Sequence, residues 1–374
     1  MLGGGQLGRF FTIAAQKMGY LVVVLDPDTK SPAGKIANKH ICKPYDDLKA
    51  LDELKSSCVA VTTEFENIPA ETLMYLEKDI IVHPGSKAVS IVQNRIKEKN
   101  FLSKCGCPVG QYKVIDSLAT IKNIDNQHDI FPGILKTAQF GYDGKGQIHV
   151  NNRIELEAAF KEFNSKSCIL EKKLDLDLEV SLVLSRLTNK NFEIYPLIEN
   201  QHVSGILDLS IIPARINSSV KQEAINLAKK ISSELDYIGV LAIEFFVSKN
   251  ILYVNEIAPR PHNSGHFSID TCVYNQFDQQ VLVLSGNELK KIDVKFPIAV
   301  MLNLLGDLWF RHGEQKEPKF QMVEGEGIKI HLYGKAEPRP GRKMGHITIL
   351  GLKNQSQKDV IDKSEIIRKT LWKN

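Results

Sequence analysis

The chain has little of what membrane and secreted proteins carry. Only 7% of its 374 residues are aromatic, and no apolar run approaches the roughly 18 residues that a membrane-spanning helix needs. The segment from Met1 to Arg9 also lacks a basic leader followed by an apolar stretch, which is the pattern of a secretory signal. We therefore predict a cytoplasmic protein without a membrane partner.

Cysteine is scarce, and neither sign of charge is in excess. The six cysteines are scattered, and the closest two, Cys105 and Cys107, are separated by one residue instead of the two found in redox and zinc-binding pairs. We interpret all six as reduced structural thiols. The 48 Lys and Arg residues alternate with 44 Asp and Glu residues, which does not indicate a nucleic acid partner. Anionic small molecules are favoured if some basic side chains gather in a pocket.

The length predicts two or three domains. Residues 1–93 alternate short apolar runs, such as Tyr20–Leu25, with helical patterns, which is typical of a Rossmann-like parallel α/β sheet. One long helix is predicted from Ser86 to about Lys104. A small unit over residues 94–172 and a larger α+β unit over residues 173–374 follow.

A glycine-rich motif, Gly3-Gly-Gly-Gln-Leu-Gly8, precedes the first predicted helix. It fits the dinucleotide fingerprint G-x-G-x-x-G, and Asp26 ends the next predicted strand, where a ribose-binding acid would lie. Alone, this pattern favours NAD or FAD, but glycines admit any anion at a helix N-terminus, including a phosphorylated substrate. Only Met1 and Leu2 precede the glycines, so we expect a trimmed or misassigned start that lacks an interior strand of the sheet.

The most informative feature is a predicted hairpin whose strands, Leu241–Val247 and Ile251–Ile257, are joined by Ser-Lys-Asn. Its register puts Glu244 opposite or diagonal to Asn255 and Glu256. Two carboxylates about 4 Å apart would repel by about 4 kcal/mol at an effective dielectric near 20. A divalent cation removes this cost, and two carboxylates with an amide oxygen suit Mg²⁺. The alternative is that one or both Glu side chains point to solvent, but the donor-rich Pro-Arg-Pro-His-Asn-Ser-Gly segment that follows favours a metal and phosphate site.

A second glycine-rich loop, Gly141-Tyr-Asp-Gly-Lys-Gly146, lies between two predicted strands. Its backbone N–H groups could close over phosphates with the added charge of Lys145, or it could be a simple hairpin loop. Lys136 lies inside an apolar strand, where a buried ammonium needs a partner such as a nucleotide phosphate. Glu171 could accept from a ribose hydroxyl or adenine, or it could be a solvated glutamate.

A rigid basic turn lies near the C-terminus, in Pro338-Arg-Pro-Gly-Arg-Lys-Met-Gly-His346 with Lys335 before it. Charge runs usually form solvated surface. Two prolines and a glycine restrict Arg342, however, so a phosphate-binding role is a competing interpretation.

Together these segments resemble the ATP-grasp superfamily, and more narrowly its 5-(carboxyamino)imidazole ribonucleotide synthase family of purine biosynthesis. The resemblance runs almost end to end and rests on five motifs: Gly3-Gly-Gly-Gln-Leu-Gly-Arg9, Thr63-Glu-Phe-Glu-Asn67, Gly141-Tyr-Asp-Gly-Lys-Gly-Gln147, Asn255-Glu-Ile-Ala-Pro-Arg-Pro-His-Asn-Ser-Gly-His266 and Arg339-Pro-Gly-Arg-Lys-Met-Gly-His346. It implies an ATP-grasp fold with three domains: an N-terminal Rossmann-like (pre-ATP-grasp) substrate domain over 1–93, a small lid domain over 94–172 and a large C-terminal α+β domain over 173–374.

The resemblance also implies the substrates and the role of each residue. ATP, bicarbonate and 5-aminoimidazole ribonucleotide would give ADP, phosphate and the N-carboxylated ribonucleotide. Glu244 and Glu256 would bind Mg²⁺, and Arg260, His262 and Asn263 would be catalytic, positioning bicarbonate. Gln6, Leu7, Lys335 and Arg342 would bind the ribonucleotide. The implied ATP-binding residues are Arg95, Lys136, Gly141, Tyr142, Asp143, Gly144, Lys145, Gly146, Gln147, Glu171, Lys172, Lys173, Leu174, Glu179, His202, Asn255 and Glu256.

Three alternatives are open at this point. The formate-dependent glycinamide ribonucleotide transformylase is also an ATP-grasp ligase, although the His262-Asn-Ser-Gly-His266 form favours the carboxylating enzyme. An NAD-dependent dehydrogenase leaves the carboxylate hairpin unexplained, and a non-catalytic nucleotide-binding module leaves the full set of metal and phosphate ligands unexplained. The resemblance further implies a homodimer, and it allows transient handover of the product to the mutase that follows in the pathway.

Overall fold

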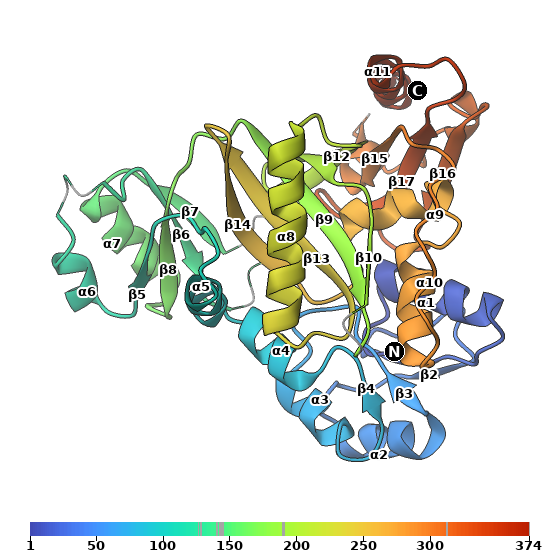
Figure 1. Ribbon diagram of the computed structural model, residues 1–374, viewed down its shortest axis with the longest axis horizontal. Helices are drawn as coiled ribbons and strands as arrows, with labels where there is room; N and C mark the ends of the chain where they lie inside the picture. The colour runs from blue at the N-terminus through green and yellow to red at the C-terminus, as the bar shows by residue number, and fades with distance from the viewer. Residues whose placement is uncertain are drawn as a thin grey trace.

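The computed structural model describes residues 1–125, 127, 129–139, 141, 146–188, 191–311 and 313–373. A central sheet carries a small unit at one end, on the left of Figure 1, and the N-terminal unit along its lower edge. Across the described ranges, every helix is too short or too polar to span a membrane.

Residues 1–93 form short parallel strand pairs flanked by helices. The elements are α1 (Gln6–Lys17), β1 (Val23–Leu25), β2 (Lys39–Ile41), α2 (Leu48–Ser57), β3 (Ala60–Val61), α3 (Ala70–Leu76), β4 (Ile81–Val82) and α4 (Ser86–Val92). β1 pairs with β2 and β3 pairs with β4, both in parallel, as the alternating pattern predicts.

Met1 and Leu2 connect the two strand pairs. Leu2 is fully buried and bridges Leu25 on one side and Thr63 on the other. Its N–H donates to the Thr62 carbonyl at 2.8 Å, and the Leu25 N–H donates to the Met1 carbonyl at 2.9 Å. As expected, no full strand lies between the two pairs within residues 1–93, all of which the structure describes, and only the isolated bridges of Leu2 join them. These bridges still anchor the glycine-rich loop, because the Gly3 N–H donates to the Leu25 carbonyl at 3.0 Å.

The prediction of a single helix from Ser86 to Lys104 is wrong. Two helices, α4 and α5 (Arg95–Lys104), occupy this range. Asn94 causes the break. Its backbone is extended, and its side-chain oxygen accepts hydrogen bonds from the N–H groups of Ile96 and Lys97. A side chain that caps a helix N-terminus in this way competes with continuation of the preceding helix.

The small unit is an antiparallel sheet covered by two helices. Its elements are β5 (Tyr112–Ile115), α6 (Leu118–Lys122), β6 (Gly133–Thr137), β7 (Gln147–Val150), α7 (Arg153–Glu162) and β8 (Cys168–Lys172), with the strand order β5-β8-β6-β7. Leu135, Phe160 and Leu170 belong to the buried cluster between the sheet and these helices. The register brings Lys136 of β6 and Glu171 of β8 close to one another on adjacent strands.

The large unit is built on a sheet with the order β14-β13-β9-β11-β12-β15-β17-β16, and β10 pairs with β9. Its elements are β9 (Leu178–Arg186), β10 (Phe192–Ile194), β11 (Ile198–Val203), β12 (Ile206–Ile212), α8 (Ser218–Glu234), β13 (Gly239–Ser248), β14 (Ile251–Ala258), η1 (Asn263–Phe267), α9 (Ser268–Thr271), α10 (Gln276–Leu284), β15 (Ala299–Leu305), η2 (Gly306–Phe310), η3 (Phe320–Met322), β16 (Ile328–Leu332), β17 (Lys343–Leu350) and α11 (Gln357–Lys373).

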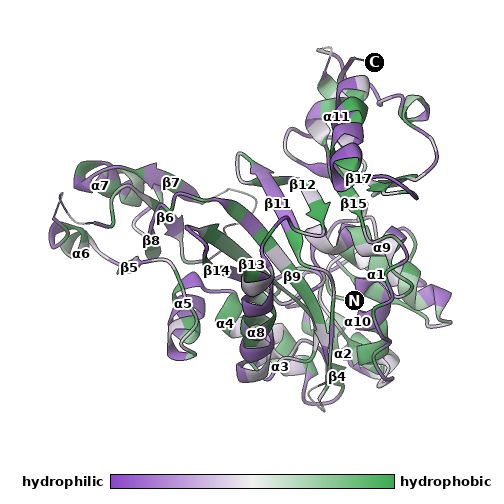
Figure 2. Ribbon diagram, turned by 45° about the horizontal axis from the view of Figure 1, so that its top comes forward, coloured by the Kyte–Doolittle hydropathy of each residue, from purple (hydrophilic) through white to green (hydrophobic). Residues whose placement is uncertain are grey.

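Two amphipathic helices cover this sheet. α8 crosses β9 and β13 in Figure 1, and its Val220, Ala224 and Ile231 join the largest buried cluster. α11 alternates hydrophobic and hydrophilic residues in Figure 2, and it buries Val360 and Ile367 against the C-terminal strands. This helical spacing leaves one face of each helix apolar, so burial against the sheet holds both in place.

Candidate functional site

The predicted site residues converge on one cavity of about 570 Å³ where the three units meet. The small unit, α5, the ends of β13 and β14 and the N-terminal loops all contribute to its walls. The predicted residues that line it are Gln6, Leu7, Arg95, Lys136, Gly141, Gly146, Gln147, Glu171, Lys172, Lys173, Leu174, Glu179, His202, Glu244, Asn255, Glu256, Arg260, His262 and Asn263.

Six predicted residues are not among these. Tyr142, Asp143, Gly144 and Lys145 lie outside the described residues. Lys335 and Arg342 do not line the cavity. The Lys335 ammonium donates to the Lys343 carbonyl at 2.6 Å, and the Arg342 guanidinium donates to the Glu337 carbonyl at 2.7 Å.

The hairpin register places Glu244 directly opposite Glu256, and a β-bulge follows Glu244. Each carboxylate has a partner of its own. Glu244 lies 3.1 Å from the His262 ring, and Glu256 lies 3.0 Å from the Arg95 guanidinium. The repulsion expected from the sequence is therefore already reduced by two basic side chains that hairpin geometry alone does not reveal.

These residues also fit a divalent cation. The two carboxylates are paired in register, and the side-chain oxygen of the adjacent Asn255 is buried and makes no hydrogen bond within the described part of the chain. Two carboxylates and a carbonyl-type oxygen form a hard donor set of the kind that Mg²⁺ prefers. An orphaned buried acceptor beside them is what a cation ligand looks like before the ion binds.

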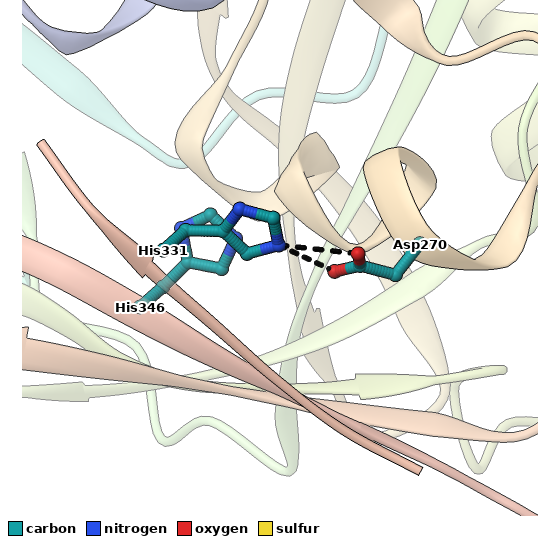
Figure 3. Close-up of side chains that lie close together, drawn as sticks. All are labelled: Asp270, His331 and His346. Carbon is teal, nitrogen blue, oxygen red and sulfur yellow. Dashed lines mark hydrogen bonds and ion pairs between the residues drawn. The ribbon is translucent and has the colours of Figure 1, made fainter. Parts of the chain in front are cut away.

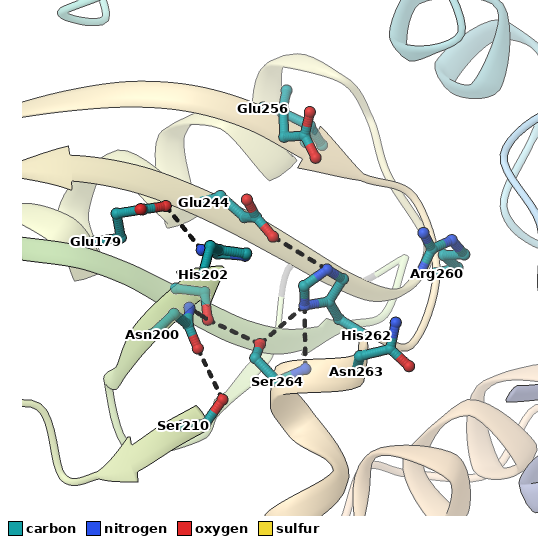
Figure 4. A network of polar contacts seen from close by, with 12 residues as sticks. Glu179, Asn200, His202, Ser210, Glu244, Glu256, Arg260, His262, Asn263 and Ser264 are labelled. Carbon is teal, nitrogen blue, oxygen red and sulfur yellow. Dashed lines mark hydrogen bonds and ion pairs between the residues drawn. The ribbon is translucent and has the colours of Figure 1, made fainter. Parts of the chain in front are cut away.

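His262 is held at both ring nitrogens, as Figure 4 shows. Its Nδ1 accepts from the Ser264 N–H at 3.3 Å and lies 2.8 Å from the Ser264 hydroxyl, while its Nε2 faces Glu244. In this arrangement Nδ1 accepts, so Nε2 carries a proton and donates a hydrogen bond to Glu244. Burial raises the pKa of Glu244, but the hydrogen bond and charge of His262 outweigh it, so the carboxyl stays ionised well below its ordinary pKa.

Ser264 extends this network into the sheet. The Ser181 hydroxyl donates to Ser264, the Asn200 amide donates to Ser181, and the Ser210 hydroxyl donates to Asn200, all between 2.8 and 2.9 Å. Three strands therefore fix the orientation of His262, and through it that of Glu244.

The small unit contributes a buried ion pair to the wall of the cavity. The Lys136 ammonium lies 2.6 Å from the Glu171 carboxylate, and both side chains are about nine-tenths buried. Glu179 and His202 also line the cavity, and the Glu179 carboxylate lies 2.9 Å from the His202 ring. Burial lowers the pKa of His202, but its hydrogen bond to the Glu179 carboxylate and the charge of Glu244 outweigh this effect and raise that pKa above its ordinary value.

Arg260 and Asn263 connect the hairpin to the N-terminal unit. Arg260 forms an ion pair with Glu66, and the Asn263 side-chain oxygen accepts from the Gln6 amide at 3.2 Å. Burial raises the pKa of the Glu66 carboxyl, but Arg260 outweighs this effect and holds it below the ordinary value. The carboxylate therefore fixes Arg260 at the cavity wall as a permanent cation.

The glycine-rich loop at α1 binds an internal anion. The N–H groups of Gly5 and Gly8 both donate to the Glu64 carboxylate, so this side chain occupies the position that a dinucleotide phosphate would need. Asp26 is engaged as well, accepting from the Gly4 N–H at 2.7 Å and from the Tyr45 hydroxyl at 2.8 Å. The dehydrogenase alternative therefore loses both its phosphate cradle and its ribose acid.

Sequence reasoning did not assign several residues that line the cavity. These are chiefly Glu64, Glu66, Glu98 and Lys343. The first two lie in the motif Thr63-Glu-Phe-Glu-Asn67, which by its sequence indicates only the family resemblance and no role in the site. Glu98 and Lys343 each lie in a run of charged residues that resembles solvated surface.

A histidine cluster lies outside the cavity, where the last residues of two motifs meet. His346 stacks on His331 at 4.6 Å between ring centroids and on His266 at 4.9 Å, and Asp270 lies 2.9 Å from His331 (Figure 3). Asp270, His331 and His346 lie close enough to be considered as metal ligands. Stacked rings direct their in-plane lone pairs along nearly parallel planes, however, so one ion cannot lie in both planes. We interpret the cluster as packing between α1 and the C-terminal strands.

The comparisons with known proteins agree across the whole chain. Family models match the ribonucleotide synthetase preATP-grasp domain at residues 1–93, the ATP-grasp domain at 100–277 and the phosphoribosylaminoimidazole carboxylase C-terminal domain at 299–359. The N5-carboxyaminoimidazole ribonucleotide synthase of Staphylococcus aureus (strain COL) is 41% identical over 373 residues, covering 98% of this chain and 96% of that protein.

Two solved structures are similar in fold over their full length. A Staphylococcus aureus N5-carboxyaminoimidazole synthetase complexed with ADP has a TM-score of 0.89 and 39% identity, covering 99% of this chain and 95% of that one. An Aspergillus clavatus N5-carboxyaminoimidazole synthase in complex with ADP and 5-aminoimidazole ribonucleotide has a TM-score of 0.88 and 25% identity, covering 100% and 98%. This chain belongs to the N5-carboxyaminoimidazole ribonucleotide synthase family of ATP-grasp enzymes.

Proposed function

We propose that this chain catalyses the ATP-dependent carboxylation of 5-aminoimidazole ribonucleotide with bicarbonate, giving 5-(carboxyamino)imidazole ribonucleotide, ADP and phosphate. The observation that carries the proposal is that one cavity is lined both by the in-register pair Glu244 and Glu256 and by the Lys136–Glu171 ion pair. An ATP-grasp ligase needs both, one for the metal and one for the nucleotide. Family membership supplies the identity of the acceptor.

The first step is attack by a bicarbonate oxygen on the γ-phosphorus of ATP. A bond forms from that oxygen to phosphorus, the bond to the bridging oxygen breaks, and ADP leaves, so the product is carboxyphosphate. Transfer of this kind depends on alignment and charge neutralisation more than on covalent help from the protein. Lys136 offsets phosphate charge, and Arg260, which Glu66 holds in place, orients the bicarbonate.

Glu244 and Glu256, with Asn255 beside them, would hold Mg²⁺. When bound, this ion supplies charge neutralisation at the phosphates of ATP. The contribution of His262 is to keep Glu244 ionised and correctly turned, through the hydrogen bond at 3.1 Å.

The second step joins the carboxyl group to the acceptor. The exocyclic amine of the aminoimidazole attacks the carboxyl carbon, or the CO₂ released from it, phosphate leaves, and the nitrogen loses a proton. Carboxyphosphate is labile in water, so the small unit must close over the cavity before this step. The ribonucleotide phosphate would be bound by Lys335 and Arg342 at the edge of the C-terminal strands, with Gln6 and Leu7 facing the substrate.

Three further proposals follow from the resemblance rather than from this chain alone. The enzyme is proposed to be cytoplasmic and to act as a homodimer. Because its product is unstable, transient handover to the following mutase is proposed as well.

The test is ADP release with Mg²⁺-ATP and bicarbonate, measured with and without 5-aminoimidazole ribonucleotide. Glycinamide ribonucleotide with formate serves as the parallel control. Stimulation by the aminoimidazole alone is the expected result. Stimulation only by glycinamide ribonucleotide with formate would instead assign the chain as the formate-dependent transformylase. ADP release that does not depend on either acceptor would overturn both ligase assignments.

A further inference from the structure

Helix α5 carries charged residues on the face that it buries. Glu98 and Lys99 are each only 2% exposed, whereas the neighbouring Lys97 is exposed. Burial of an ion is costly unless it is paired, so a buried Glu-Lys step on a short helix requires partners. Glu98 has one in the Ile257 N–H, which donates to it at 2.7 Å. None of the roles assigned above uses Lys99.

Lys99 joins the small unit to the metal-binding strand. Its ammonium donates to the Asn255 carbonyl at 2.9 Å and lies 3.4 Å from the Val254 carbonyl, both on β14. The same ammonium lies 3.4 Å from Oε1 of Glu171, on β8 of the small unit. One side chain therefore touches the backbone beside the metal ligand Glu256 and the carboxylate on the nucleotide side.

Glu171 consequently forms ion pairs with two ammonium groups, each through a different carboxylate oxygen. Lys136 lies 2.6 Å from Oε2, and Lys99 lies 3.4 Å from Oε1. Apart from this ion pair, Oε1 makes no hydrogen bond within the described part of the chain. Burial raises the pKa of Glu171, but Lys136 and then Lys99 outweigh it, so the carboxyl is held well below its ordinary pKa. It is a permanent buried anion.

ATP binding changes this balance, given the nucleotide site proposed above. Lys136 must turn toward the phosphates to neutralise them, and the shorter of the two ion pairs of Glu171 is then weakened or lost. A buried carboxylate left without a counter-ion is strongly unfavourable, because nothing then offsets the removal of its charge from water. Lys99 contacts the other oxygen, does not line the cavity and is held by two backbone carbonyls of β14.

We propose that Lys99 is a positioning residue for nucleotide binding: it keeps Glu171 paired when Lys136 moves from that carboxylate to the phosphates of ATP. It acts through Glu171 and Lys136 and is not a catalytic residue. Its role is to lower the free energy required to release Lys136.

The first measurement is the affinity of the full-length protein for Mg²⁺-ATP by titration calorimetry. Lys99→Met should weaken binding by at least about ten-fold, which lies within the coupling energies measured for contacting residues. In steady state, the KM for ATP should rise while the KM for 5-aminoimidazole ribonucleotide and kcat stay near wild type. Lys99→Arg should restore most of the affinity. Lys97→Met, on the exposed face of the same helix, is the matched control and should bind as wild type does.

The second measurement is a double-mutant cycle with Glu171→Gln. Once the carboxylate is removed, Lys136 has no buried anion to leave behind, so adding Lys99→Met should change the ATP affinity by less than about two-fold. A purely structural role, through the Val254 and Asn255 carbonyls, predicts the opposite, namely the same loss in both backgrounds. Additive effects would therefore overturn the proposal.

Two other results would also overturn it. One is a Lys99→Met protein that folds and binds Mg²⁺-ATP within two-fold of wild type. The other is failure of both Lys99→Met and Lys99→Gln to fold, because the proposal gives Lys99 no essential role in the unliganded fold. If wild type itself does not bind Mg²⁺-ATP, the nucleotide site and the proposed function fail with it, whereas the outcomes above leave that function intact.

Discussion

Glu244 and Glu256 are direct cross-strand partners, yet the side chains that neutralise them come from opposite directions in the chain. His262, six residues after Glu256, lies 3.1 Å from Glu244. Arg95, from the helix that begins the small unit, binds Glu256 at 3.0 Å. The carboxylate pair therefore lies where the large unit and α5 meet, and removal of either carboxylate also leaves a basic group at the cavity without its partner.

Glu256→Gln should abolish ATP turnover. The substitution removes one of the two carboxylates of the proposed Mg²⁺ site and leaves Arg95 without its counter-ion, and loss of such electrostatic stabilisation typically lowers kcat by about 100-fold or more. The measurement is ADP release under saturating substrates. Glu223→Gln, on the exposed face of α8, is the control and should behave as wild type does. ADP release by the Glu256 variant at the wild-type rate would defeat the metal assignment.

The carboxylate pair could be read from the sequence because its geometry is local. A short turn between two apolar strands determines which residues face each other, and Glu244 and Glu256 need no distant information to be placed together. The alternating runs of the N-terminal sheet and the grasp hairpin were predictable for the same reason.

The missed residues depend on contacts between distant parts of the chain. The bond from Gly5 to Glu64 spans 59 positions, and the bond from Lys99 to Asn255 spans 156. No pattern over a few residues encodes these contacts. Lys99 was also hidden by its neighbours, because a run of Arg, Lys and Glu on a helix usually faces water, and only packing against β14 shows otherwise.

Arg342→Ala should raise the KM for 5-aminoimidazole ribonucleotide by about ten-fold or more, because it removes the proposed charge-assisted bond to the ribonucleotide phosphate. The KM for ATP should not change, since Arg342 does not line the central cavity. Arg339→Ala is the matched control in the same turn, where Arg339 is exposed and pairs with Glu337. Steady-state kinetics with each substrate varied in turn measure both KM values. An unchanged KM for the ribonucleotide would show that its phosphate binds elsewhere.

Stability should fall below about pH 6.5, the ordinary pKa of histidine in an unfolded chain. Burial lowers the pKa of His266 and His346 well below that value in the folded protein. Between the two pKa values the unfolded chain binds more protons, so the free energy of unfolding decreases with falling pH, by up to about 1.4 kcal/mol per pH unit for each histidine. Urea unfolding between pH 7.5 and about 5 measures this slope.

Two variants separate the contribution of these histidines to the pH dependence of stability from that of the other titratable groups. His346→Gln should flatten the slope by about one proton. Tyr333→Phe removes the hydroxyl that lies 3.0 Å from His346 but keeps both imidazoles, so it should lower stability and leave the slope as in wild type. Equal slopes for wild type and His346→Gln would contradict the assignment of the pH dependence to this cluster.

Gly8→Ala should destabilise the protein, although Gly→Ala inside a helix ordinarily stabilises. A Cβ at Gly8 would lie 2.7 Å from the Gly3 carbonyl oxygen and 3.3 Å from the Glu64 carboxylate, so the loop that binds Glu64 would have to open. Overpacking of this kind costs about 1 to 3 kcal/mol. Gly325→Ala is the control, because its Cβ would have only the Ile328 side chain nearby, at an ordinary contact distance of 3.7 Å. Chemical denaturation of both variants measures the difference. Equal or greater stability of Gly8→Ala would show that binding of the Glu64 carboxylate does not require the close approach of Gly8 to Gly3. Binding of a dinucleotide or phosphate to the same loop would then have to be measured by direct titration.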